Sequence, residues 1–164
     1  PNIRLPLWSS AEACQETVRE FLPDADLVKL SDEECFFVTG KHSILDAADW
    51  LFEQGCKMVL YSMGKEGAMI LTPHFSSHVE NPEVRVKDTT GAGDAIIGAY
   101  LYCLAKNHIT VSQLADCLPE QVQEWLTFAV YYANYSITKS GAIASYPDYT
   151  TFVKWMQEKR KKAH

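Results

Sequence analysis

Short apolar runs of strand length alternate along this chain with longer segments whose apolar residues recur at helical spacing. Strand-like runs occupy residues 27–30 and 57–61, and helix-like segments precede the first run and separate the two. Strands that alternate with helices are typical of sheets covered by helices on both faces. The pattern therefore predicts an α/β fold with three layers, α/β/α, and a largely parallel sheet.

The second half of the chain adds hairpin-like strands and three helices. Two glycines in the turn at residues 64–67 separate 57–61 from 68–71, which predicts a hairpin, and the alternation at 83–87 predicts a further strand. The first of the three helices is expected to follow Gly93, the second to begin at about Pro119 and the third at Asp148.

Composition narrows the class of protein. A chain of 164 residues with 47% hydrophobic and 22% charged residues is sufficient for one globular domain. Fifteen Lys and Arg against 21 Asp and Glu give a net charge of −6, the wrong sign for a protein that neutralises phosphates along a nucleic acid. The same charge disfavours an anionic membrane as a partner. We therefore expect neither nucleic acid nor membrane binding.

Cysteine usage indicates the compartment. The five cysteines form no CxxC pair and are spread through apolar stretches, which disfavours a disulfide framework or a zinc site. No apolar run approaches the ~18 residues of a membrane helix, and the first residues lack a signal-peptide layout. We expect a cytoplasmic protein.

The segment Asp88-Thr-Thr-Gly-Ala-Gly-Asp94 carries the strongest chemical signal. It lies between a predicted strand and a predicted helix, where free backbone N–H groups and the helix dipole favour an anion such as phosphate. Asp94 falls in the first helical turn, where a carboxylate can accept the proton of an attacking hydroxyl. A plainer interpretation is equally compatible with the residue types: Thr90 caps the helix and Asp94 complements its dipole.

Two common nucleotide-binding motifs do not match this segment. It is not GxxxxGK[ST], which excludes a Walker-type P-loop, and it lacks the spacing of GxGxxG. Phosphoryl transfer at a different kind of site remains.

The sequence resembles a known family in five places. DTTGAGDAIIGAYL is similar to the C-terminal signature of the PfkB-type, ribokinase-like carbohydrate kinases, and PNIRLPLW at residues 1–8 is similar to a stretch typical of the fructokinase branch. Residues 29–34 resemble the KxNxxE motif, 62–67 the TxGxxG nucleotide loop, and 132–142 the late helix and turn beside the adenine. The resemblance covers nearly the whole chain and implies the ribokinase-like fold.

The resemblance implies a catalytic role for the glycine-rich segment and the helix start that follows it. Asp94 would be the base that accepts the proton of a sugar hydroxyl. The amides of Gly91, Ala92 and Gly93 would form the anion hole for the γ-phosphate of ATP.

The resemblance also implies the sites of the cofactors. Glu34 would help to place Mg²⁺ through water, and Asp88 and Thr90 match positions at which many relatives hold K⁺. The residues expected to bind the nucleotide are Ser31, Ser62, Gly64, Gly67, Asn134 and Gly141. Two alternatives stay open, because Ser31 and Glu34 also have the spacing of a helix capping box, and Asn134 could equally be a buried polar group with satisfied hydrogen bonds.

The family pattern also contains parts that this chain lacks. Its sugar-binding acidic residue, N-terminal glycine pair and β lid have no match here, so we expect residues 1–164 to be the C-terminal, nucleotide-binding and catalytic part of a kinase domain. The expected activity is ATP-dependent phosphorylation of fructose by the complete protein, a homodimer, with the fragment alone inactive. The alternatives are another sugar or a nucleoside as acceptor, or a non-catalytic nucleotide-binding module.

Overall fold

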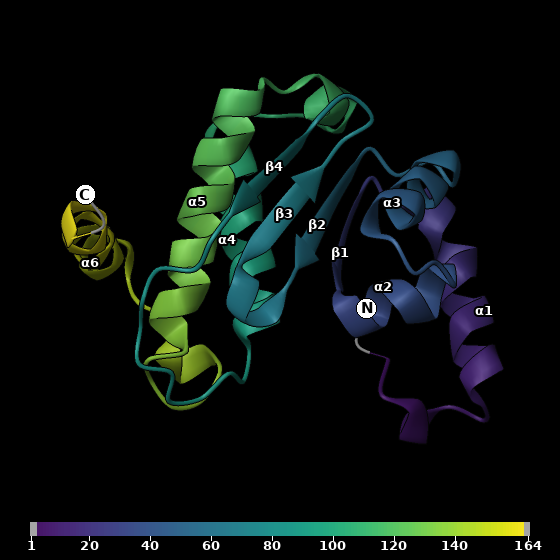
Figure 1. Cartoon of the computed structure of the whole chain (residues 1–164), viewed down its shortest axis with the longest axis horizontal. Coiled ribbons are helices and arrows are strands. Elements are labelled where there is room, and N and C mark those ends of the chain that lie inside the picture. Colours follow the sequence, from purple (N-terminus) through teal and green to yellow (C-terminus); the bar gives the residue numbers. More distant parts are fainter. Residues whose placement is uncertain (1–2, 163–164) are drawn as a thin grey trace.

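The computed structural model describes residues 3–162, so Pro1 and Asn2 of the fructokinase-like stretch lie outside the described residues. Helices and strands alternate in its first half, and long helices dominate its second half (Figure 1). The elements in chain order are α1 (Ala11–Phe21), β1 (Leu27–Ser31), α2 (Asp32–Thr39), α3 (Ile44–Glu53), β2 (Met58–Ser62), β3 (Ala68–Leu71), β4 (Ser76–Val79), α4 (Ala92–Lys106), α5 (Pro119–Ser136) and α6 (Tyr149–Lys162).

The four described strands form one sheet in the order β1-β2-β3-β4. Strand β1 pairs with β2 in parallel, with Lys29 opposite Leu60, whereas β2 with β3 and β3 with β4 are antiparallel. The prediction of a largely parallel sheet was therefore wrong for the described strands, and the sheet is mixed. The cause is local, because β2, β3 and β4 follow one another through short turns, and a short turn joins only antiparallel neighbours.

The strand expected at residues 83–87 is absent. These residues form an extended connection that leads toward α5, where the Lys87 and Asp88 amides both donate to the Ile137 carbonyl at 2.8 and 3.2 Å. The strand that completes the sheet is β4, in a segment whose sequence is largely polar. The hairpin between β2 and β3 is confirmed.

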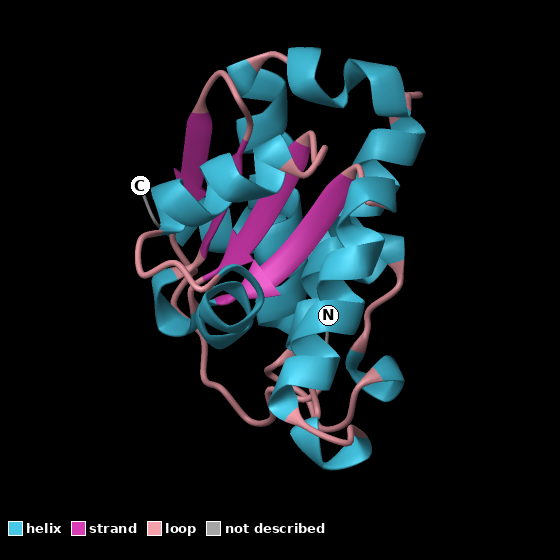
Figure 2. Cartoon of the chain, turned by 90° about the vertical axis from the view of Figure 1, so that its right-hand side faces the viewer, coloured by secondary structure: helices cyan, strands magenta, loops and turns pink. Residues whose placement is uncertain are grey.

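Helices cover both faces of the sheet, so the expected three-layer α/β arrangement is confirmed (Figure 2). Alternate side chains of β2 lie on opposite faces of the sheet. Met58 and Leu60 pack with α4 and α5, whereas Val59 packs with α2 and α3. Helix α6 packs on α5 through the fully buried Phe152, whose ring meets that of Phe128 edge to face at 4.9 Å. No helix within residues 3–162 has the length and apolar character needed to cross a membrane.

Candidate active site

The site is built around the first turn of α4. Gly91 precedes the helix with φ 79°, a left-handed conformation that favours glycine, and no side chain caps the helix start. The Ala92 amide donates to the Thr89 carbonyl at 3.1 Å, but the amides of Gly91, Gly93 and Asp94 have no acceptor within residues 3–162. Three backbone donors at a helix N-terminus make a ready site for an anion.

The turn before α4 is held by the carboxylate of Asp88. One oxygen accepts from the Thr90 amide at 2.9 Å and the other from the Gly141 amide at 2.8 Å. These hydrogen bonds, that of Gly141 first, lower the pKa of Asp88 to about 2. Thr90 therefore does not cap α4, and the plainer interpretation of this residue is excluded.

A cavity of about 810 Å³ opens beside the free amides. It brings together most of the residues expected to meet the nucleotide, from β1, β2, the hairpin turn, α4 and α5. Those in its lining are Ser31, Ser62, Gly64, Gly67, Ala92, Gly93 and Asn134. Gly91, Asp88, Thr90, Glu34 and Gly141 do not line it; Gly141 instead contacts Asp88, so its predicted nucleotide contact has no support here.

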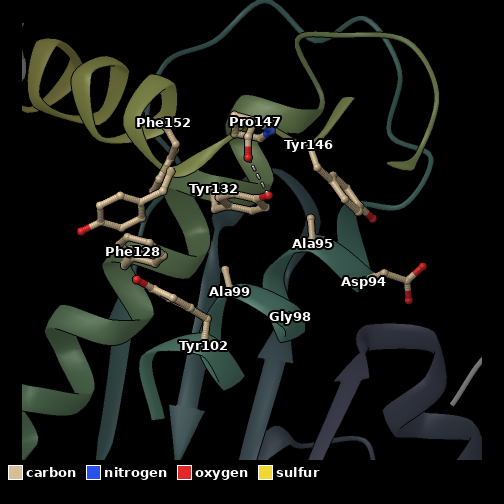
Figure 3. A pocket seen from close by; sticks show the side chains of 11 residues that line it. Asp94, Ala95, Gly98, Ala99, Tyr102, Phe128, Tyr132, Tyr146, Pro147 and Phe152 are labelled. Carbon is tan, nitrogen blue, oxygen red and sulfur yellow. Dashed lines mark hydrogen bonds between the residues drawn. The ribbon is translucent and has the colours of Figure 1, made fainter. Parts of the chain in front are cut away.

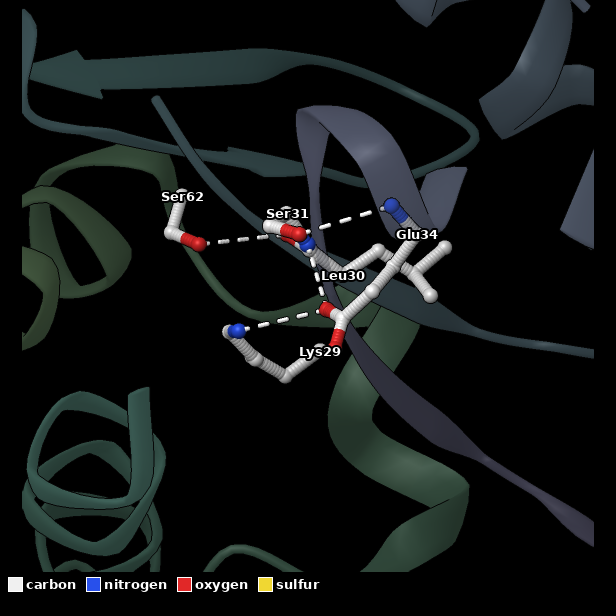
Figure 4. Close-up of polar contacts among 5 residues, drawn as sticks. All are labelled: Lys29, Leu30, Ser31, Glu34 and Ser62. Atoms are coloured by element: carbon white, nitrogen blue, oxygen red, sulfur yellow. Dashed lines mark hydrogen bonds and ion pairs between the residues drawn. The ribbon is translucent and has the colours of Figure 1, made fainter. Parts of the chain in front are cut away.

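Lys29 lines this cavity and forms a partly buried ion pair with Glu34 (Figure 4). Glu34 Oε2 lies 3.4 Å from Lys29 Nζ and accepts the Ser31 amide at 2.8 Å, while Ser31 Oγ accepts the Glu34 amide at 3.4 Å. The capping box is therefore present. It occupies one oxygen of Glu34 and leaves Oε1 without a hydrogen bond from the described residues.

Glycine occupies the two positions of the hairpin turn, 64 and 67, for different structural reasons. Both have positive φ, 53° at Gly64 and 99° at Gly67. A Cβ at Gly67 would lie 2.0 Å from the Val79 carbonyl oxygen, whereas a Cβ at Gly64 would meet no atom within 4 Å. Packing against Val79 is therefore enough to explain Gly67. At Gly64 the missing side chain leaves open space beside the cavity.

Asn134 is buried and acts through a second asparagine. Its side-chain amide donates to the Val130 carbonyl at 2.9 Å and to Asn81 Oδ1 at 2.7 Å, and Asn81 in turn donates to the Gly64 carbonyl at 2.8 Å. Asn134 thus has satisfied hydrogen bonds and supports the turn at Gly64 from α5. No motif in the sequence marks Asn81 as part of this site.

Asp94 lies at the edge of a second, smaller cavity of about 280 Å³ between α4, α5 and α6. Its carboxylate is exposed, makes no hydrogen bond with a described side chain, and points away from the aromatic rings (Figure 3). The residues that line this aromatic pocket are Asp94, Ala95, Gly98, Ala99, Tyr102, Phe128, Tyr132, Tyr146, Pro147, Tyr149 and Phe152. The acid is therefore free to act on a ligand beside the helix start.

Comparison with known proteins decides the family. The model of the pfkB family carbohydrate kinases matches residues 1–149. This chain belongs to the pfkB family. The resemblance seen in the sequence is thereby confirmed, and the family's glycine-rich signature coincides with the start of α4.

Several pfkB kinases are similar over most of this chain. Probable fructokinase-5 of Arabidopsis thaliana is 35% identical over 162 residues, which are 98% of this chain and 48% of the relative. Fructokinase from Xylella fastidiosa with bound ATP has a TM-score of 0.87 at 26% identity, with 96% of this chain and 50% of that chain covered. A double mutant of Vibrio cholerae O395 fructokinase in fructose, ADP and potassium ion bound form has a TM-score of 0.81 at 29% identity, covering 95% and 48%. The ribokinase-like fold is confirmed, and the chain spans about half the length of these relatives.

Besides Asn81, two residues near this site were given no role from the sequence: Lys29, which lies within the KxNxxE-like segment, and Tyr146. Lys29 is a cation inside a strand whose neighbours Val28 and Leu30 are buried, and that misplaced charge was a readable signal. Tyr146 donates a hydrogen bond to Gly91 from 55 residues further along the chain, and no local pattern marks it.

Proposed function

We propose that this chain is the nucleotide-binding and catalytic-base part of an ATP-dependent sugar kinase whose acceptor is fructose. One observation carries the proposal: free amides at the start of α4 lie beside a cavity of nucleotide size, which Gly93 lines, and a carboxylate without a hydrogen-bond partner among the described residues follows in the same helical turn. A module that only bound nucleotide would need the amides but would gain nothing from Asp94.

The reaction follows from this arrangement. ATP would occupy the 810 Å³ cavity with its γ-phosphate against the Gly91 and Gly93 amides, because these donors and the helix dipole stabilise charge on the transferred group. Asp94 would accept the proton of the sugar hydroxyl as its oxygen forms a bond to the γ-phosphorus. The bond from that phosphorus to the β-phosphate oxygen breaks, and ADP and the sugar phosphate leave.

Glu34 suits a role in placing Mg²⁺ through water. One of its oxygens is engaged by Ser31 and Lys29, and Oε1 is available to accept a hydrogen bond from a metal-bound water. Within residues 3–162 no group of three or more acidic, histidine or cysteine side chains gathers as a metal site. This fits an ion that keeps several waters and is bound largely by ATP, where it neutralises phosphate charge.

The proposal also includes a K⁺ ion bound near Asp88 and Thr90. The Asp88 carboxylate accepts two backbone amides and, with about four lone pairs, retains capacity for a cation. Such an ion would order the same turn that Asp88 already holds. Comparing activity in KCl with activity in NaCl tests it, and equal rates would remove K⁺ from the proposal.

The acceptor is tested on the longest natural polypeptide that contains this sequence. We expect a higher kcat/KM for fructose than for ribose or adenosine, because relatives similar over most of this chain are fructokinases. If kcat/KM were higher for ribose or a nucleoside, that compound would be the acceptor instead of fructose. If no phosphate were transferred to any of them, a non-catalytic nucleotide-binding module would be favoured. The 164-residue chain alone should be inactive, since the family's sugar-binding residues have no match in it.

Compartment and assembly complete the proposal. All five cysteines are free and buried, which suits a reducing compartment such as the cytoplasm. The complete protein is proposed to be a homodimer, which light scattering on the purified polypeptide measures directly.

A further inference from the structure

Tyr146 contacts the anion-binding turn from the far end of the chain. Its hydroxyl donates to the Gly91 carbonyl at 2.9 Å, and its ring lies in the aromatic pocket on the same side as Asp94 (Figure 3). A Cβ at Gly91 would lie 2.8 Å from the Tyr146 hydroxyl oxygen. The tyrosine therefore fills the space that a side chain at position 91 would need.

The hydrogen bond from Tyr146 is one of three that hold the peptide group between Gly91 and Ala92. The Gly91 carbonyl also accepts the Ala95 amide at 2.8 Å, and the N–H of the same peptide, that of Ala92, donates to Thr89 at 3.1 Å. A planar peptide held at both polar ends cannot rotate. Since Gly91 has no side chain to restrict its own φ and ψ, these contacts set the direction in which the Gly93 amide points.

Tyr146 is itself held firmly. The short helix before it, Ile143–Ser145, ends on the buried Ser145, whose hydroxyl donates to the Ala142 carbonyl at 2.6 Å. The next residue, Pro147, accepts the Tyr132 hydroxyl at 3.2 Å, and the Tyr132 and Tyr146 rings are 6.1 Å apart. Burial, with the nearby Asp94 charge, raises the pKa of Tyr146, so its hydroxyl stays a donor at neutral pH.

We propose that Tyr146 is a positioning residue for phosphoryl transfer, which holds the Gly91–Ala92 peptide so that the amides at the start of α4 converge on the transferred phosphate. The proposal rests on the kinase function proposed above. It assigns a role to a residue outside the glycine-rich signature, 55 positions beyond Gly91.

The test compares Tyr146→Phe with Tyr149→Phe. Each variant removes one tyrosine hydroxyl from the lining of the same aromatic pocket, but the Tyr149 hydroxyl contacts Lys106 and only that of Tyr146 contacts the turn. In the 164-residue chain, amide hydrogen exchange is measured at Ala92 and Ala95, with the β2 amides as an internal measure of global stability. In the longest natural polypeptide, kcat and the KM for ATP are measured with fructose.

We expect Tyr146→Phe to speed exchange at Ala92 and Ala95 while leaving β2 unchanged, and to lower kcat roughly 2- to 12-fold, the loss of about one hydrogen bond. The KM for ATP should change less than kcat, and Tyr149→Phe should resemble the unsubstituted protein in both measurements. Equal exchange at Ala92 and Ala95 in all three proteins would overturn the proposal, as would faster exchange with unchanged kcat. If the unsubstituted polypeptide transferred no phosphate, the proposed function would fail, and with it a role for Tyr146 in that reaction.

Discussion

The Nζ atom of Lys29 lies 3.2 Å from the position that a Cβ at Gly93 would occupy. A strand from one half of the sheet thus delivers an ammonium group to the start of α4, where Glu34 holds it. The free amides and this cation would act on the same anion, since the helix N-terminus and the ammonium group both carry positive charge.

Replacing Lys29 tests this joint action. We expect Lys29→Met to lower kcat/KM for ATP roughly 10- to 100-fold, because it removes one charge-assisted hydrogen bond to phosphate. Steady-state kinetics in the longest natural polypeptide measure it. Lys57→Met is the matched control, since Lys57 forms an ion pair with Asp26 at 2.7 Å next to the start of β2. Equal losses in the two variants would show that Lys29 does not meet the nucleotide.

Asp94→Asn tests the catalytic base. The change preserves size and the helix start but removes the ability to take a proton, so kcat should fall by about 10²- to 10⁴-fold with little change in the KM for ATP. Gly93→Ala provides contrast, because its Cβ would crowd Lys29 and should weaken ATP binding as well. If Asp94→Asn retained more than about a tenth of kcat, Asp94 would serve the helix dipole alone.

Gly67→Ala and Gly64→Ala separate backbone strain from collision. Both glycines have positive φ, but only a side chain at Gly67 would overlap Val79. Gly67→Ala should therefore lower the free energy of unfolding by about 1–3 kcal/mol more than Gly64→Ala does. Urea denaturation of the 164-residue chain gives both values. Equal losses would mean that β4 moves aside without penalty.

Acid should loosen the turn before α4 through Asp88. Its pKa of about 2 in the folded protein lies below the ordinary value of 3.8, so the charged carboxylate stabilises the folded state. This contribution to stability is complete above pH about 4 and is lost as the pH falls toward 2. Unfolding of Asp88→Asn, compared with the unsubstituted chain at pH 5 and at pH 2.5, should differ more at pH 5. A difference that did not depend on pH would contradict the assignment.

The sequence predicted those parts of the fold and site that depend on neighbouring residues. Strand β1, the hairpin at Gly64 and Gly67 and the start of α4 all follow from short-range patterns of apolar residues and glycines, and the structure contains each of them. The capping box of Ser31 and Glu34 is equally local, with both partners three residues apart.

The parts that escaped prediction depend on contacts between distant residues. Strand β4 has a weak pattern of its own, with Ser76 and His78 exposed, and is a strand because β3 pairs with it. Asn81 and Tyr146 gain their roles from partners 53 and 55 residues away. No local signal in a single sequence records such a pairing, whereas Lys29 was recognisable as a charge in a buried strand.

The long separation between the turn and the residues that hold it has a consequence during synthesis. Gly141 and Tyr146 are made 53 and 55 residues after Asp88 and Gly91, which at bacterial to eukaryotic elongation rates is a delay of roughly 3 to 11 seconds. The glycine-rich turn therefore leaves the ribosome without its hydrogen-bond partners. Its anion-binding geometry therefore cannot be complete until residue 146 has been made.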